Sequence, residues 1–217
     1  MQFFLIIFAV VSVVHVIAIF FRKEKLRRIS KLFIVPPLLA AYIAGQGVTL
    51  IFPVLALVLG WIGDALLIRI NEKNFFRLGL GSFLLGHVCY IITFAERLGF
   101  FNGTGEINIT AIAVFIPLAI IVGVMVFRFI KPTKDMALPV ILYTIVIEVM
   151  TFWGFEIFIL SPGFAGLLIF AGALCFMISD TMLAYYTFRE LTLPGAVLLM
   201  VFYIMAQAGI IIGLMSI

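Results

Sequence analysis

The sequence has little charge and no long polar stretch. Charged residues make up 11% of its 217 residues and hydrophobic residues 65%, whereas soluble domains carry about 25% charged residues. This balance excludes a separate hydrophilic domain of any size. We therefore expect one domain over residues 1–217, an all-α bundle of helices in a membrane.

Cysteine and histidine are also scarce, and their counts exclude several kinds of site. The two cysteines, Cys89 and Cys175, lie inside apolar runs and indicate no disulfide framework. With two histidines, a zinc site with three histidine ligands cannot be built. A carboxylate-rich metal site stays open, but no acids stand at ligand spacing. No G-x-S-x-G motif or Ser–His–Asp spacing marks a nucleophile, and we expect no metal and no cofactor.

Apolar runs of about 20 residues recur along the whole chain, each long enough to cross ~30 Å of hydrocarbon. The runs are continuous and do not alternate, so they indicate helices and not a barrel. Positive charge follows the first run instead of preceding it, so we expect a span there and no cleavable signal peptide. Eight transmembrane helices are predicted, at about 3–21, 32–46, 48–68, 75–95, 108–128, 135–157, 163–187 and 193–215.

Basic residues lie almost entirely on one side of this predicted membrane topology. Of the 14 Lys and Arg residues, all but Arg97 fall in the segments after spans one, three, five and seven. By the positive-inside rule that side is the cytoplasm, so both termini lie on the non-cytoplasmic side. Short basic loops fit phospholipid headgroups and not nucleic acid. We expect membrane lipids as partners, no protein partner, and a cell membrane location, the inner membrane in a bacterium.

Two aspartates lie inside predicted spans, Asp64 in GWIGDALLI (60–68) and Asp180 in FMISDTMLAYY (176–186). An acid within a span costs a few kcal/mol, so such residues usually face a bundle interior or a water cavity and are functional. The alternative is a structural hydrogen bond, or an acid whose side chain snorkels to the nearby interface. Two carboxylates that meet in a dry pocket cannot both ionise easily, so one can serve as acid and the other as base.

Other polar side chains in the spans have two possible roles each. Glu148, in ILYTIVIEVMTFW, is either a cavity acid or a residue bonded to a neighbouring helix. His87 is either a proton shuttle or a satisfied core residue, and Glu156 is expected at the outer interface. Further candidates for a cavity lining are Tyr90, Ser179, Tyr203 and Gln207.

Five segments together resemble the YhhN family of membrane proteins, whose animal members are lysoplasmalogenases. The matching segments are SKLFIVPPLL (30–39), GWIGDALLI (60–68), NFFRLGLGSFLLGHVCYIITF (74–94), FMISDTMLAYYTF (176–188) and YIMAQ (203–207). The family is regarded as having eight spans, in agreement with the count above. Glu148 is not part of its pattern.

The resemblance implies hydrolysis of the vinyl ether bond of lysoplasmalogen to a fatty aldehyde and a glycerophospho-ethanolamine or -choline. Asp64 and Asp180 would be the catalytic acid and base, and His87 and Tyr90 would orient the water or an acid. Lys31 or Arg69 would meet the phosphate of the headgroup, although Lys31 could also be an ordinary cytoplasmic-side lysine.

Two other functions also fit paired intramembrane acids. A proton-coupled transporter or flippase of a small amphiphile uses such acids for alternating access. An intramembrane aspartyl protease also uses paired acids, but its G-x-G-D motif is missing here, because Gly60 lies one position too early. We therefore expect an ether-bond hydrolase, with the transporter as the alternative.

Overall fold

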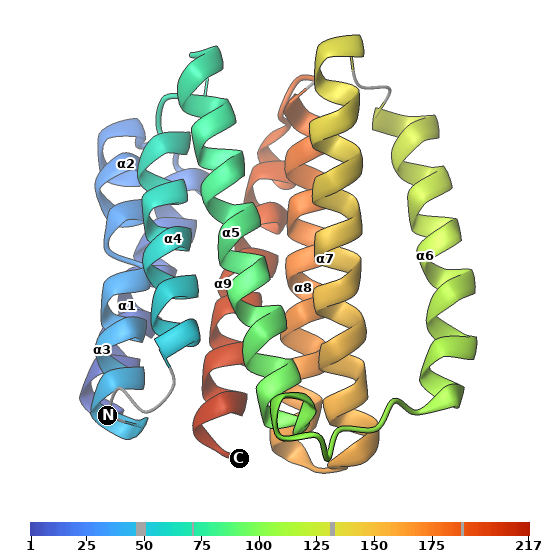
Figure 1. Ribbon diagram of the computed structural model, residues 1–217. Helices are drawn as coiled ribbons and strands as arrows, with labels where there is room; N and C mark the ends of the chain where they lie inside the picture. Colours follow the sequence, from blue (N-terminus) through green and yellow to red (C-terminus); the bar gives the residue numbers. More distant parts are fainter. Residues whose placement is uncertain (47–50, 71, 131–132, 188) are drawn as a thin grey trace. The chain divides into compact units, whose positions relative to one another are not determined.

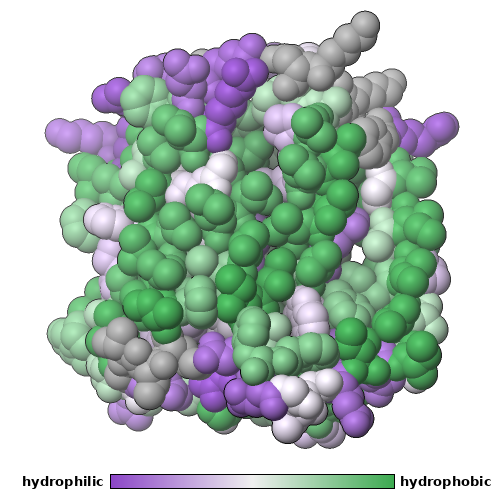
Figure 2. All heavy atoms as spheres, viewed as in Figure 1, coloured by the Kyte–Doolittle hydropathy of each residue, from purple (hydrophilic) through white to green (hydrophobic). Residues whose placement is uncertain are grey.

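The computed structural model describes residues 1–46, 51–70, 72–130, 133–187 and 189–217. In these ranges every regular element is a helix and there is no strand. The all-α expectation is therefore confirmed. Hydrophobic side chains cover the flanks of the helices, and hydrophilic side chains gather at the helix ends (Figure 2).

The described chain packs as two compact units, which we call unit 1 (Met1–Thr93) and unit 2 (Phe94–Ile217). Unit 1 contains α1 (Gln2–Phe20), α2 (Glu24–Leu32), α3 (Val35–Gln46), α4 (Ile51–Leu67) and most of α5 (Lys73–Arg97). Unit 2 contains the end of α5, the 3-10 helix η1 (Phe100–Asn102), α6 (Ile109–Ile130), α7 (Lys134–Leu160), α8 (Phe164–Thr187) and α9 (Leu193–Met215). The single domain expected for residues 1–217 stays a prediction.

Within unit 2, α8 packs against both α7 and α9, and α6 lies beside α7 (Figure 1). Glycines let α8 and α9 approach closely. A Cβ on Gly172 would lie 2.7 Å from the backbone nitrogen of Ile210, and one on Gly209 would lie 2.8 Å from the carbonyl oxygen of Leu168. Such close packing of small residues is how helices associate in lipid, where no hydrophobic force draws them together.

Seven helical segments in the described ranges are long and apolar enough to cross a membrane. They are Gln2–Phe20, Glu24–Gln46, Lys73–Arg97, Ile109–Ile130, Met136–Leu160, Phe164–Thr187 and Leu193–Met215. The remaining apolar helix, α4, has 17 residues, and residues 48–50 at the start of the third predicted span lie outside the described ranges. The chain is an integral membrane protein; the eighth span and the side of the termini stay predictions.

The second predicted span begins earlier than expected and is broken. We expected it to start near residue 32, after a basic loop, but α2 already begins at Glu24 and is a polar helix rich in basic residues. The helix ends at Leu32, and α3 begins at Val35, directly before Pro36 and Pro37. Proline lacks the N–H that a helix interior needs but is tolerated in a first turn. The two prolines therefore separate α2 from α3.

The connection from α5 to α6 contains the short helix η1 and a turn. Gly99 and Gly103 have φ angles of 77° and 72°, in the left-handed region where glycine has no steric penalty. These two residues bracket η1 and reverse the chain direction before α6.

Candidate functional site

Asp64 is buried near the end of α4, with 2% of its surface exposed. Its Oδ1 lies 3.4 Å from Nζ of Lys31, whose side chain is 19% exposed. Lys31 stands in the last turn of α2, directly before the break that leads to α3. The break thus places a basic side chain beside the buried acid of unit 1.

Packing of α4 against α2 and α5 holds Asp64 in place. The indole Nε1 of Trp61 donates a hydrogen bond of 2.8 Å to the carbonyl oxygen of Leu32, at the end of α2. On the side of α5, a Cβ at Gly63 would lie 2.6 Å from the ring of Phe83. Gly63, the neighbour of Asp64, is therefore a packing position, and a side chain there would push α5 away.

The α5 glycines are not all equivalent. A Cβ at Gly79 would lie 2.9 Å from Leu67, and one at Gly86 would lie 3.3 Å from the carbonyl oxygen of Ala56, so both are contact positions with α4. A Cβ at Gly81 would meet nothing within 4 Å. Gly81 is therefore not a contact position between α5 and α4, unlike the other two glycines.

Three further candidates of unit 1 lie around α4 and α5. His87 and Tyr90 of α5 are each 1% exposed, one turn apart on the same helix. Arg69 follows α4 and is exposed, with its guanidinium 4.8 Å from the centre of the Phe75 ring. Arg69 is therefore at the surface end of α4, while His87 and Tyr90 are inside the unit.

Asp180 is the buried acid of unit 2, with 9% of its surface exposed. It lies in α8 and accepts a hydrogen bond of 2.5 Å at Oδ2 from the hydroxyl of Tyr143 in α7. Tyr143 was missed by sequence reasoning. It lies in the same segment, ILYTIVIEVMTFW, as Glu148, and a tyrosine hydroxyl within a span was the available signal, because a buried hydroxyl needs a partner.

The other candidates of unit 2 form contacts between α8 and α9. Ser179 donates a hydrogen bond of 3.2 Å to the carbonyl oxygen of Leu199. Gln207 donates one of 3.3 Å from Nε2 to the hydroxyl of Tyr203, and the ring of Tyr203 packs edge-on against Phe176 with centroids 5.8 Å apart. All three candidates are buried and lie in the same unit as Asp180.

The two glutamates of α7 differ in surroundings. Glu148 is half-buried and lines a groove against α6, away from Asp180. Glu156 is fully buried near the end of α7, and its two carboxylate oxygens lie 3.2 and 3.3 Å from the backbone nitrogen of Asn108, from whose N–H they accept a hydrogen bond. This contact satisfies a backbone N–H next to the start of α6, where such groups have no partner within the helix. The position of Glu156 at the outer interface stays a prediction.

The structure therefore places the candidates in two groups. Lys31, Asp64, Arg69, His87 and Tyr90 belong to unit 1. Glu148, Ser179, Asp180, Tyr203 and Gln207 belong to unit 2. The meeting of Asp64 with Asp180 stays a prediction. Within the described ranges, no three His, Cys, Asp or Glu side chains come together as metal ligands would.

Comparison with known proteins gives one match. The chain matches the YhhN family over residues 26–214, which includes both aspartates and every other candidate residue. No curated protein and no solved structure matches it. The match covers most of the chain, and the protein therefore belongs to the YhhN family.

Proposed function

We propose that this protein hydrolyses the vinyl ether bond of lysoplasmalogen, releasing a fatty aldehyde and a glycerophospho-ethanolamine or -choline. The observation that carries the proposal is a pair of buried aspartates in a YhhN chain, each with a polar partner from a neighbouring helix. Lys31 lies beside Asp64, and Tyr143 is bonded to Asp180.

The reaction needs an acid and a base and no other catalytic group. An acid protonates the outer carbon of the double bond, which leaves an oxocarbenium ion at the carbon attached to oxygen. Water adds to that carbon while a base takes its proton, and the resulting hemiacetal collapses to the aldehyde and the glycerol hydroxyl. Positioned carboxyl groups perform such proton transfers, and a carboxylate also stabilises the cation.

The polar partners of Asp64 and Asp180 indicate which aspartate is the base and which is the acid. An ammonium group close to a carboxylate favours its ionised form, so Asp64 beside Lys31 is the base that faces the cation and deprotonates water. Asp180 is then the acid. Tyr143 donates to Oδ2 of Asp180, which leaves Oδ1 to carry the proton. The proposal requires the two side chains to share one site.

The remaining candidates have supporting roles in this proposal. His87 and Tyr90 orient the water, and Ser179, Tyr203 and Gln207 line the site beside Asp180. Arg69, exposed at the end of α4, meets the headgroup phosphate. Lys31 also binds the phosphate. It can pair with Asp64 at the same time, since an ammonium has three donors.

Three lysolipids with the same chain and headgroup test the proposal. They differ only in a vinyl ether, an ester or an alkyl ether linkage. The released chain is measured with the purified protein in detergent micelles, as fatty aldehyde from the vinyl ether, fatty acid from the ester or fatty alcohol from the alkyl ether. We expect turnover of the vinyl ether alone, because only its double bond can be protonated at carbon. Turnover of the ester without the vinyl ether would overturn the mechanism.

The same experiment separates the enzyme from the transporter alternative. An enzyme works in micelles, whereas a carrier needs two compartments. No aldehyde in micelles, together with accumulation of the lysolipid in sealed vesicles, would favour the proton-coupled carrier.

A further inference from the structure

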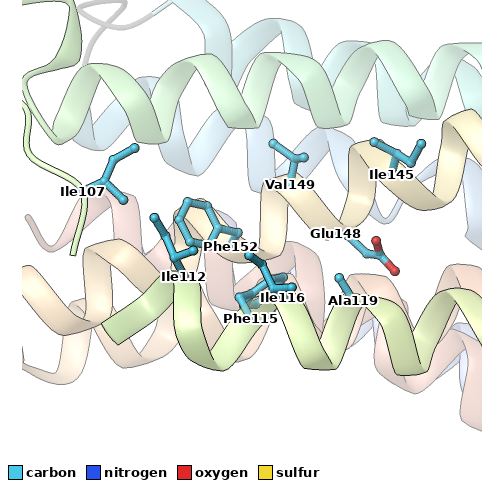
Figure 3. A pocket seen from close by; sticks show the side chains of 9 residues that line it. All are labelled: Ile107, Ile112, Phe115, Ile116, Ala119, Ile145, Glu148, Val149 and Phe152. Atoms are coloured by element: carbon cyan, nitrogen blue, oxygen red, sulfur yellow. The ribbon is translucent and has the colours of Figure 1, made fainter. Parts of the chain in front are cut away.

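A groove between α6 and α7 carries a single acid among apolar side chains. Its volume is about 330 Å³, and of its nine lining residues only Glu148 is charged. Figure 3 shows the Glu148 side chain near Ala119 of α6, with Ile145 at the same end of the groove and the other apolar residues spread from there toward Ile107.

This groove is separate from the surroundings of Asp180. Tyr143 and Glu148 are five residues apart on α7, a rotation of about 140° around the helix axis. Tyr143 therefore faces α8, where it bonds Asp180, while Glu148 faces α6. One helix serves two different sites in unit 2.

The groove exists because α6 packs loosely in this unit. Only 17% of the apolar stretch of α6 is buried, against 44% for α8 and for α9. Contact with α7 is made by Phe115, whose ring lies 5.6 Å from that of Phe152. Near Glu148 the residue on α6 is Ala119, which is too small to fill the space.

The Glu148 carboxyl needs a hydrogen-bond donor that the described residues do not supply. Its Oε1 is buried and has no hydrogen-bond partner among them. Glu148 lies near the middle of a membrane-spanning helix, where no bulk water replaces a missing partner and an unsatisfied polar group costs several kcal/mol. The remaining lining is apolar, so it offers no donor.

We propose that this groove binds a single-chain amphiphile whose polar end donates a hydrogen bond to Glu148, through a hydroxyl or an amine. The apolar lining holds the alkyl chain, and Oε1 accepts the bond. A volume of about 330 Å³ is at the lower end of the range of ligand pockets, about 300–1,000 Å³, so the groove holds one chain and not a whole phospholipid. The inference does not depend on the proposed hydrolysis.

Photolabelling of the purified full-length protein in detergent micelles tests this site. One probe is a long alkyl alcohol with a photoreactive group in its chain, and the matched probe is the methyl ether of the same alcohol, which can accept but not donate. We expect labelling, mapped by mass spectrometry, on α6 and α7 around Phe115 and Phe152, where the apolar lining would hold the alkyl chain. The alcohol should label about three- to tenfold more than the ether, the effect of one hydrogen bond.

Variants then test whether the preference for the alcohol over the ether depends on Glu148. Glu148→Leu removes the acceptor and keeps the bulk, so the ratio of alcohol to ether labelling should fall to about one. Ala119→Phe fills the groove and should abolish labelling by both probes. Ala113→Phe is the matched control, because Ala113 is an exposed position on α6 outside the groove, and it should label like the wild type.

Three results would overturn the inference. They are equal labelling of the wild type by the two probes, labelling confined to other helices, or an unchanged ratio in Glu148→Leu. If Glu148→Leu fails to fold, the inference is still tested by the ratio of alcohol to ether labelling in the wild type and by the comparison of Ala119→Phe with Ala113→Phe.

Discussion

Among single residues, the pair Lys31–Asp64 differs from the surface ion pair Arg27–Glu24. Asp64 is buried at 2% exposure and Lys31 is partly buried at 19%, whereas the side chains of Arg27 and Glu24 are 40% and 60% exposed. Exposed pairs contribute about 0–1 kcal/mol. Removing one partner of a fully buried pair costs about 3–5 kcal/mol, because it leaves a buried charge uncompensated, so a pair with one partly buried partner lies between these limits.

Lys31→Gln removes the ammonium 3.4 Å from the carboxylate of Asp64, and it should therefore lower the free energy of unfolding by about 1–3 kcal/mol. The matched variant Glu24→Gln should change it by less than about 1 kcal/mol. Denaturant or thermal unfolding of the purified variants in detergent measures both. Equal stability of the two variants would show that Lys31 does not stabilise buried Asp64.

The hydrogen bond from Tyr143 to Asp180 makes a second residue-scale prediction. Tyr143→Phe leaves a buried carboxyl oxygen without this donor, at a cost of about 1–3 kcal/mol in stability. In the proposed mechanism it also lowers kcat, by about 10- to 100-fold, an effect within the range of one positioned hydrogen bond.

Tyr185→Phe is the control for this prediction. It removes a hydroxyl from α8 but keeps the ring that Arg189 covers at 5.1 Å, so aldehyde release and stability should stay near wild type. A Tyr143→Phe protein with wild-type kcat would remove Tyr143 from the mechanism.

At this scale, sequence reasoning found the acids but not their partners. Asp64 and Asp180 are conspicuous because a charge within an apolar run is costly. Tyr143 and the inward position of Lys31 depend on which faces of separate helices meet. That information comes from packing across helices and has no local signature in the chain.

Among the helices, the contact between α8 and α9 depends on glycine residues. Gly172→Ala would place a Cβ 2.7 Å from the backbone nitrogen of Ile210, so the two helices would have to separate. We expect a loss of about 1–3 kcal/mol, as in overpacked cores, measured as a lower Tm in detergent.

Gly123→Ala in α6 is the matched control for this substitution. A Cβ there meets nothing within 4 Å, and alanine favours a helix over glycine by about 1 kcal/mol. Its Tm should be unchanged or higher. A Gly172→Ala protein as stable as Gly123→Ala would show that α8 and α9 do not pack as described.

Helix positions were more predictable than helix boundaries. The predicted spans at 75–95 and 193–215 match α5 and α9 closely, because long apolar runs in a chain without soluble domains leave few alternatives. The start of α2 was missed because its residues are mostly charged, and a polar helix at a membrane surface resembles a loop in hydropathy. The break after α2 did have a signal in the sequence, because Pro36 and Pro37 favour the start of a new helix, α3.

For the whole molecule, the number of membrane spans determines on which side of the membrane each loop lies. With eight spans, Asn102 and Ser161 lie outside the cell, and Lys23 and Leu191 lie in the cytoplasm. If α4, with its 17 residues, does not cross, every loop after it changes sides. The distribution of basic residues favours eight.

Single cysteines at these four positions test the topology with a membrane-impermeant thiol reagent. In intact cells, or spheroplasts if the host has an outer membrane, Asn102→Cys and Ser161→Cys should react, and Lys23→Cys and Leu191→Cys should react only after permeabilisation. Cys89 and Cys175 lie within membrane-spanning helices and serve as the unlabelled background. Labelling of Lys23→Cys and Asn102→Cys from the same side would contradict the eight-span count.

In the proposed mechanism Asp64 and Asp180 act as one acid–base pair on a vinyl ether, and the decisive test is kcat/KM for aldehyde release by their variants. The measurement compares the wild type, Asp64→Asn, Asp180→Asn and the double variant, all checked for folding by thermal unfolding. Each single substitution should lower kcat/KM by at least about 100-fold, and the double variant should be no worse than the poorer single one, because residues that act as a unit are not additive. A single variant with wild-type turnover, or losses that multiply in the double variant, would contradict the account.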